Sequence, residues 1–260
     1  MDQKKYSIKK KDSPIIALAL HDGHILPERL LPYMKLTDPE RFREEDPYTG
    51  YMADLPVNQV IVHSSRFMID LNRLEGKAIY KDPQDAWGLI VWDDSLPASE
   101  EKKLISYYRS FYEDMQELIE SLIERFGYFL ILDIHSYNHR RDAYNQEAPL
   151  IDNPEINIGS RFNDEKWNPL IQHFIHLLSH ATIGGKQPDV RENIKFKGGG
   201  FSQWANQHYS EKGSTISIEF KKTFMDEWTG RADIDHILDI RKALLSTLDP
   251  LGKQLKSFMA

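Results

Sequence analysis

Residues 128–134 read YFLILDI, a continuous apolar run followed directly by His135. Such a run is typical of a strand that is buried on both faces of a sheet. The preceding residues 99–127 carry apolar side chains at three- and four-residue steps, which predicts a long amphipathic helix. Ser99 can cap the start of this helix, and Gly127 suits its end.

Similar patterns recur on both sides of this helix and strand. Four further segments look like strands: residues 15–20, 59–63, 67–71 and 215–220. Three more look helical: residues 166–181, 201–209 and 234–258, the last with an expected interruption near Pro250. Strand, long helix and strand in this order indicate a βαβ unit, so we expect an α/β fold with a mixed, mostly parallel sheet. The 260 residues contain no repeat or low-complexity linker, and we expect one domain spanning residues 1–260.

Composition excludes several classes of protein. With 40% hydrophobic and 11% aromatic residues the chain is too apolar to be disordered. No apolar run approaches the roughly 18–20 residues of a membrane span, and residues 15–20 are too short for the core of a signal peptide. The net charge of −7 argues against nucleic-acid binding. We therefore expect a cytoplasmic protein without nucleic-acid or membrane partners.

Polar side chains stand at the ends of three expected strands. His21 and His24 follow residues 15–20, His135 closes residues 128–134, and Glu219 lies near the end of residues 215–220. Ligands of open α/β sheets bind beyond the carboxyl ends of the strands. We expect these side chains to share one rim of the sheet.

Two or three of these histidines can hold a metal ion. The chain has no cysteine, so a metal must be held by His, Asp or Glu. His21 and His24 can face one ion if the chain turns at Gly23, and His135 is a candidate third ligand, with Asp133 placed to orient its ring. Ordinary polar loop residues would give the same pattern. Several carboxylates compete for the third position: Glu28 and the cluster Glu44, Glu45 and Asp46.

Glu219 is a carboxylate inside an otherwise apolar run. Burial raises the pKa of a carboxyl group, which suits a general base that takes a proton from water. A structural ion pair with Lys221 or Lys222 is the alternative interpretation.

A third group of residues can bind anions. Arg66, Asn72 and Arg73 lie close together in the sequence and can form a fork-like receptor for a carboxylate, although an Arg66–Asp70 ion pair would produce the same string. Further arginines are weaker candidates for anion binding: Arg140, Arg141 and Arg191.

Five motifs together resemble a known family. They are HDGHILPE at 21–28, SRFMIDLNR at 65–73, LDIHS at 132–136, KGGG at 197–200 and IEFKKTFMDE at 218–227. In order and spacing they resemble the N-formylglutamate amidohydrolase family over roughly residues 15–227. The resemblance implies a three-layer α/β/α fold, phosphorylase/hydrolase-like, shared with zinc carboxypeptidases and aspartoacylases, and one Zn²⁺ per chain.

The resemblance also implies roles for individual residues. It places two metal ligands, a catalytic glutamate and an arginine beside the scissile carbonyl: His21, His135, Glu219 and Arg66. Asn72 and Arg73 match the pair that binds the substrate carboxylate, and Arg191 is a further substrate-binding candidate. For the third metal ligand we favour His24 over the competing acids. Lys221 and Lys222 replace an arginine that is common in the family, which leaves the identity of the substrate open.

We therefore expect a zinc-dependent hydrolase of a linear amide that bears a free carboxylate, such as an N-formyl or N-acyl amino acid. Zn²⁺ held by His21, His24 and His135 would polarise the carbonyl, and Glu219 would accept a proton from water. The small-molecule substrate would be oriented through its carboxylate. A non-catalytic carboxylate- or metal-binding protein on the same scaffold is the alternative.

Overall fold

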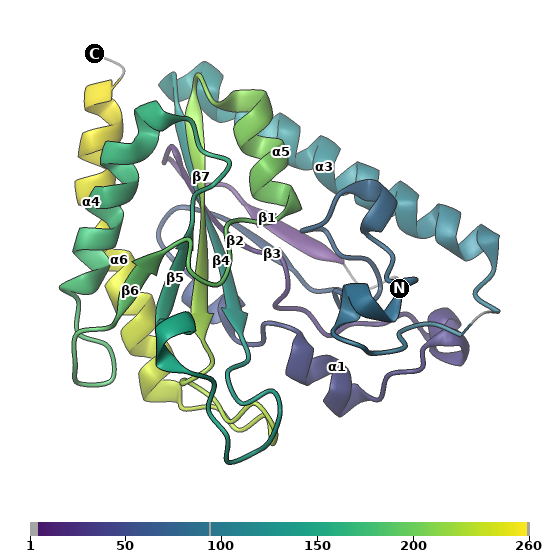
Figure 1. Ribbon diagram of the computed structural model, residues 1–260. Helices are drawn as coiled ribbons and strands as arrows, with labels where there is room; N and C mark the ends of the chain where they lie inside the picture. The colour runs from purple at the N-terminus through teal and green to yellow at the C-terminus, as the bar shows by residue number, and fades with distance from the viewer. Residues whose placement is uncertain (1–4, 94, 259–260) are drawn as a thin grey trace.

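A computed structural model describes residues 5–93 and 95–258 of the chain. Seven strands form one sheet in the order β1-β3-β2-β4-β7-β5-β6 (Figure 1). The strands are β1 (Tyr6–Lys9), β2 (Ile15–Ala19), β3 (Asn58–Val62), β4 (Phe129–Tyr137), β5 (Ile156–Gly159), β6 (Val190–Glu192) and β7 (Gly213–Lys221). The β1–β3 and β5–β7 pairs are antiparallel and the other four are parallel, which confirms the mixed, mostly parallel sheet.

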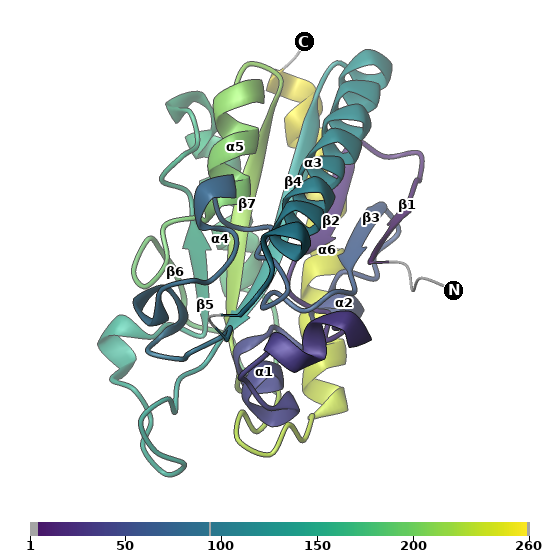
Figure 2. The same ribbon diagram turned by 90° about the vertical axis from the view of Figure 1, so that its right-hand side faces the viewer.

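Helices cover both faces of the sheet. They are α1 (Asp38–Glu44), α2 (Thr49–Met52), α3 (Ala98–Phe126), α4 (Asn168–Ser179), α5 (Gly200–Tyr209) and α6 (Ile234–Phe258). Along β2, Ala17 and Ala19 belong to the core beneath α2, α4 and α6, whereas Ile16 and Leu18 belong to the core beneath α3 and α5. Figures 1 and 2 show the sheet between these two helical layers. The three-layer α/β/α architecture is thereby confirmed.

The central strands deliver their carboxyl ends to one edge of the sheet. The parallel pair β2–β4 aligns Leu18 with Asp133, and the parallel pair β4–β7 aligns His135 with Glu219. Parallel strands are joined by long crossovers, so residues far apart in sequence meet where the strands end. This edge carries the candidate site.

Residues 67–71 are not a strand, contrary to the sequence prediction. Two side chains bind backbone N–H groups that a strand would offer to its neighbour. Ser65 Oγ accepts from the Phe67 N–H at 3.2 Å, and Asp70 Oδ1 accepts from the Asn72 N–H at 2.8 Å. Such local side-chain bonds favour turns over strands, and the segment forms turns.

Two details of the helices also differ from expectation. Helix α6 runs through Pro250 without interruption, because Leu251 and Leu255 beyond the proline remain buried in the same core as Leu244. Helix α3 begins after Pro97 rather than at a Ser99 cap, and no side chain caps it. Its end at Gly127 is confirmed, with φ of 85°.

Candidate active site

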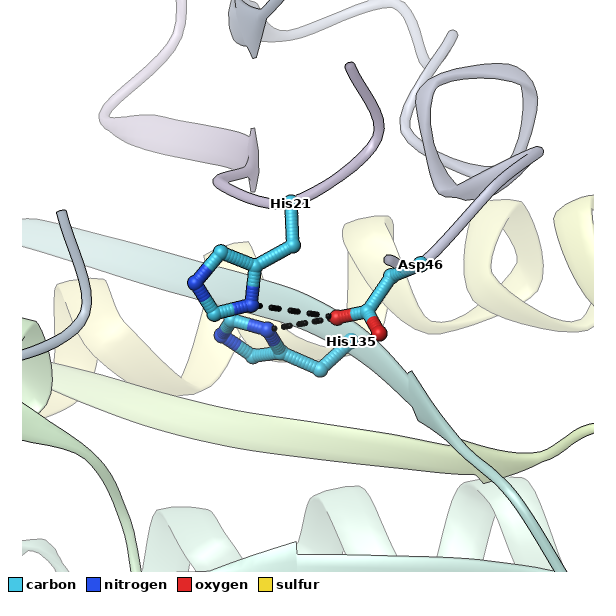
Figure 3. Close-up of side chains that lie close together, drawn as sticks. All are labelled: His21, Asp46 and His135. Carbon is cyan, nitrogen blue, oxygen red and sulfur yellow. Dashed lines mark hydrogen bonds and ion pairs between the residues drawn. The ribbon is translucent and has the colours of Figure 1, made fainter. Parts of the chain in front are cut away.

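Three polar side chains from distant parts of the chain converge beyond β2 and within β4 (Figure 3). Asp46 Oδ2 lies 3.3 Å from His21 Nδ1 and 3.1 Å from His135 Nδ1. All three residues are buried, and their candidate ligand atoms lie within 4.8 Å of one another. Across residues 5–93 and 95–258, this is the one group of histidines and acids with geometry suited to a metal ion.

The opposite nitrogen of each ring faces another carboxylate. His21 Nε2 lies 2.8 Å from Asp70 Oδ1, and His135 Nε2 lies 2.9 Å from Asp133 Oδ1. A ring that donates its Nε2 proton to a carboxylate keeps the Nδ1 lone pair free, and here both Nδ1 atoms face Asp46. Two imidazoles and a carboxylate arranged in this way fit Zn²⁺. Asp133 also occupies the orienting position expected from the sequence.

Asp46 is fixed by the loop that follows α1. Its N–H donates to the carbonyl oxygen of His21 at 2.9 Å. The buried ammonium of Lys222 donates to the carbonyl oxygens of Arg43 at 2.7 Å and Glu45 at 2.6 Å. Burial lowers the pKa of Lys222 to about 8. Burial alone would raise the pKa of Asp46, but in the protein without a cation the interactions with His135 and His21 outweigh burial and hold that pKa well below its usual range.

Glu219 stands beside this cluster, paired in register with His135 on the neighbouring strand. Its carboxylate makes no hydrogen bond or ion pair with any residue that the structure describes. The alternative ion pair does not form, because Lys221 Nζ donates to the Asn153 carbonyl at 3.1 Å and Lys222 Nζ donates to two other carbonyls. Burial raises the pKa of Glu219 to about 8. This carboxylate is free to exchange a proton with a bound molecule.

Because the pKa of Glu219 is raised, we expect the metal-free Glu219→Gln variant to be more stable than wild type, by an amount that depends on pH. The native state keeps the proton up to about pH 8, whereas the unfolded state releases it near 4.5, so native stability falls as pH rises between these values. Thermal unfolding near pH 8 should show the variant melting at least about 2–4 °C higher than wild type. Near pH 4 the difference should vanish. A difference independent of pH would contradict the raised pKa.

The cluster and Glu219 line a cavity of about 430 Å³. Five basic side chains also line it: Arg66, Arg73, Arg141, Lys195 and Lys222. Cations concentrated in a partly enclosed cavity attract anions, so the cavity suits a small molecule that bears a carboxylate.

Arg66 is held by hydrogen bonds beside the candidate metal-binding cluster. Its Nη2 lies 2.8 Å from Asp70 Oδ2 and 2.9 Å from the Tyr80 hydroxyl. Burial alone would raise the pKa of Asp70, but His21 and Arg66 together hold it well below its usual range. Asp70 therefore joins one candidate metal ligand to one candidate oxyanion-binding group. The Arg66–Asp70 pair considered as an alternative exists, and Arg66 lines the cavity as well.

The family assignment rests on the sequence as a whole. A family model described as N-formylglutamate amidohydrolase matches residues 13–225. The chain belongs to this family. It is therefore an amidohydrolase, which confirms the enzyme class expected from the motifs.

Individual relatives agree with this assignment. An N-formylglutamate deformylase of Pseudomonas putida is 25% identical over 235 residues, which cover 83% of this chain and 80% of the relative. The crystal structure of an N-formylglutamate amidohydrolase from Ralstonia eutropha JMP134 matches with a TM-score of 0.73 at 17% identity, covering 96% of this chain and 99% of that one. A gene product of Agrobacterium tumefaciens, Atu2144, matches with a TM-score of 0.64 at 18% identity, covering 94% and 96%. The two structures share the fold of this family member.

Asn72 and Arg73, for which the resemblance to the family implied a role in binding the substrate carboxylate, both line the cavity. Asn72 Oδ1 accepts from the Phe201 N–H at 3.1 Å, and Asn72 Nδ2 lies 3.3 Å from His135 Nε2. A Cβ on Gly199 would lie 2.3 Å from Asn72 Oδ1, which explains a glycine of the KGGG motif. The Arg73 guanidinium donates to the carbonyl oxygen of Asp85 at 2.6 Å.

His24 lies outside the cluster. Its Nδ1 is 2.5 Å from Glu45 Oε2, and its Nε2 is 3.3 Å from Arg41 Nη2. Gly23 sits tightly against the residue that follows β3, since a Cβ there would lie 2.0 Å from the carbonyl carbon of His63. The chain therefore carries the His24 ring toward α1 and away from the His21 side chain.

The set of side chains that meet thus differs from the expected set of His21, His24 and His135. The structure places Asp46, one of the competing acids, where His24 was expected. Glu28 begins the 3-10 helix η1 (Glu28–Tyr33) and is not in the cluster. The other two acids have partners elsewhere: Glu44 with Arg141, and Glu45 with His24.

Arg191 does not line the cavity. Its Nη1 donates to the carbonyl oxygen of Ile151 at 2.6 Å and its Nη2 to that of Leu150 at 2.5 Å. Asp189 lies 3.1 Å from the same guanidinium. The guanidinium thus binds the 3-10 helix η4 (Leu150–Asp152) that precedes β5, and the structure does not bring it to the other candidate substrate-binding residues.

Proposed function

We propose that the protein is a zinc-dependent amidohydrolase that cleaves the linear amide bond of an N-formyl amino acid. The observation that carries this proposal is the meeting of His21, Asp46 and His135 next to the carboxylate of Glu219, which has no partner among the described residues. The basic lining of the cavity supports a substrate with a free carboxylate. The formyl group is favoured because the Pseudomonas putida relative is named a deformylase.

The ligands of the ion would be His21 Nδ1, His135 Nδ1 and the Asp46 carboxylate, and one ion per chain would fit. Zinc bound there supplies Lewis acidity, which polarises an amide carbonyl and makes a water molecule more acidic. Asp70 and Asp133 would strengthen the two imidazoles as ligands, because each carboxylate accepts the Nε2 proton.

Glu219 acts as the general base and then as the general acid. Its carboxylate accepts a proton from the attacking water and returns it to the nitrogen of the leaving amine. Its pKa of about 8 applies to the protein without a cation. Positive charge beside a carboxyl group favours the ionised form, so a filled site lowers this pKa and supplies the base at neutral pH.

Arg66 stabilises the negative charge that develops on the carbonyl oxygen. Asp70 and Tyr80 fix the guanidinium before substrate binds, so little reorganisation is needed during the reaction. Asn72 and Arg73 orient the substrate through its α-carboxylate, which places the amide bond between Arg66 and Glu219.

A substrate panel with and without chelator tests this function. We expect the zinc-loaded protein to hydrolyse N-formyl amino acids faster than N-acetyl amino acids or peptides, because the formyl group is the smallest acyl group. A chelator should remove at least about 99% of the activity, and added zinc should restore it. Hydrolysis that is insensitive to chelator would contradict the metal, and the absence of hydrolysis of every N-formyl amino acid by the zinc-loaded protein would contradict the substrate.

A further inference from the structure

The basic side chains that line the cavity differ in how their charge is compensated. Three are close to carboxylates: Arg66 to Asp70, Arg73 to Asp85 and Arg141 to Glu44. Lys222 is buried and donates to two backbone carbonyls. Lys195 has no carboxylate within ion-pair distance in the part of the chain that the structure describes. A carboxylate group of a bound molecule would therefore be the first negative charge to pair with the Lys195 ammonium.

The neighbours of Lys195 hold it on the Glu219 side of the cavity. Its ammonium donates to Asn153 Oδ1, and its backbone N–H donates to Asn157 Oδ1 at 2.8 Å. Asn153 and Asn157 are both buried. Asn157 lies on β5, where it pairs in register with Glu219 of β7. Hydrogen bonds therefore hold both the backbone and the ammonium of Lys195 close to β5, which pairs with the strand that carries Glu219.

Two aromatic rings adjoin this ammonium. Tyr137 and Phe196 line the cavity, and their ring centroids are 5.5 Å apart. Lys195 Nζ lies 5.1 Å from the centre of the Tyr137 ring. The two rings thus offer apolar surface for methylene groups next to the positive charge of Lys195. That combination matches a short aliphatic side chain that ends in a carboxylate.

A second cation, Arg141, lies near Lys195. Burial lowers the pKa of Lys195, and the nearby positive charge of Arg141 lowers it further. Because Glu44 binds both terminal nitrogens of Arg141, at 3.0 and 2.7 Å, that guanidinium is already neutralised. An anion entering here would find in Lys195 a cation that no carboxylate of the described residues pairs with.

We propose that Lys195 is a specificity-determining residue whose ammonium binds a second, side-chain carboxylate of the substrate, with Tyr137 and Phe196 flanking its methylene groups. The inference rests on the proposed function; the glutamate substrate is in the name of the family, and what is inferred is the residue that would select it over a neutral N-formyl amino acid. The α-carboxylate remains with Asn72 and Arg73.

The test compares two substrates that differ only in this charge, N-formylglutamate and N-formylglutamine. In wild type, kcat/KM should favour glutamate. Lys195→Met should lower kcat/KM for N-formylglutamate about tenfold or more, mainly through KM, and change the value for N-formylglutamine less than about threefold. Lys195→Arg should restore part of the preference.

Lys197→Met is the matched control, because it removes the same charge two residues away from a side chain that does not line the cavity. It should leave both substrates unchanged. Equal losses for both substrates in Lys195→Met, or an unchanged glutamate preference, would overturn the role of Lys195.

Calorimetry with the products L-glutamate and L-glutamine separates this inference from the proposed function. Lys195→Met should weaken glutamate binding to the zinc-loaded protein about tenfold and leave glutamine binding unchanged, whether or not formyl compounds are hydrolysed. If hydrolysis fails but this binding difference is found, the reaction is wrong and the carboxylate subsite stands. If neither binding nor kinetics distinguishes the two ligands, the subsite is wrong.

Discussion

Glu219→Gln should lower kcat by about 10²–10⁴-fold while zinc content and KM stay close to wild type. Glutamine has nearly the same shape as glutamate but cannot accept the proton of the attacking water. The carboxylate has no structural partner among the described residues, so its loss leaves no orphaned group. Steady-state kinetics with an N-formyl amino acid and elemental analysis of the same preparation provide the two measurements.

The control for this variant is Glu211→Gln, which changes an exposed glutamate that pairs with Lys166 on the surface. It should leave kcat unchanged. Full activity of zinc-loaded Glu219→Gln would show that another group acts as the base. A loss of zinc together with activity would show that Glu219 is a ligand rather than a base.

Asp46→Ala should weaken zinc binding by at least about 100-fold and lower activity in proportion at limiting zinc. The substitution removes one of the three groups that face the ion and leaves the two Nδ1 atoms without their shared carboxylate. Titration of zinc against a competing chelator measures the affinity, and circular dichroism checks that the variant folds.

His24→Ala distinguishes the two candidate sets of ligands. Its ring contacts Glu45 and Arg41 and lies outside the cluster, so we expect zinc affinity within about threefold of wild type. The opposite pattern, with zinc lost from His24→Ala and retained by Asp46→Ala, would restore the set of His21, His24 and His135.

The central part of the fold was predictable from local pattern. Strands β2 and β4 are buried on both faces and appear in the sequence as continuous apolar runs, whereas β7 is equally buried but appears as isoleucines alternating with Thr, Ser and Glu. Helix α3 has an apolar stripe long enough to stand out without tertiary information. The order of these elements then indicates which strands are parallel.

The edges of the sheet were not predictable in the same way. Strands β1, β5 and β6 have only three or four residues each and gain their hydrogen bonds from neighbours far away in sequence. Residues 67–71 are apolar enough to resemble a strand, and the apolar side chains of this segment belong to the core beneath α3. A pattern of burial alone does not distinguish a buried turn from a strand.

The candidate site was predictable only where strands position it. His21, His135 and Glu219 follow from the rule that functional groups gather beyond the ends of parallel strands. Asp46 lies in an irregular segment, and nothing local distinguishes it from Glu45, its neighbour. The long-range hydrogen bond from the Asp46 N–H to the His21 carbonyl oxygen places Asp46, rather than Glu45, at the cluster. Nothing in the sequence around Lys195 indicated a functional role beyond its position shortly before the KGGG motif.

The most direct test of the metal site is X-ray diffraction from crystals of active, zinc-loaded protein, measured on both sides of the zinc absorption edge. The arrangement of His21, Asp46 and His135 predicts one anomalous peak per chain, about 2.0–2.2 Å from the two Nδ1 atoms and an Asp46 oxygen. A zinc peak coordinated by His24 instead of Asp46, or active crystals with no peak at this cluster, would contradict the account.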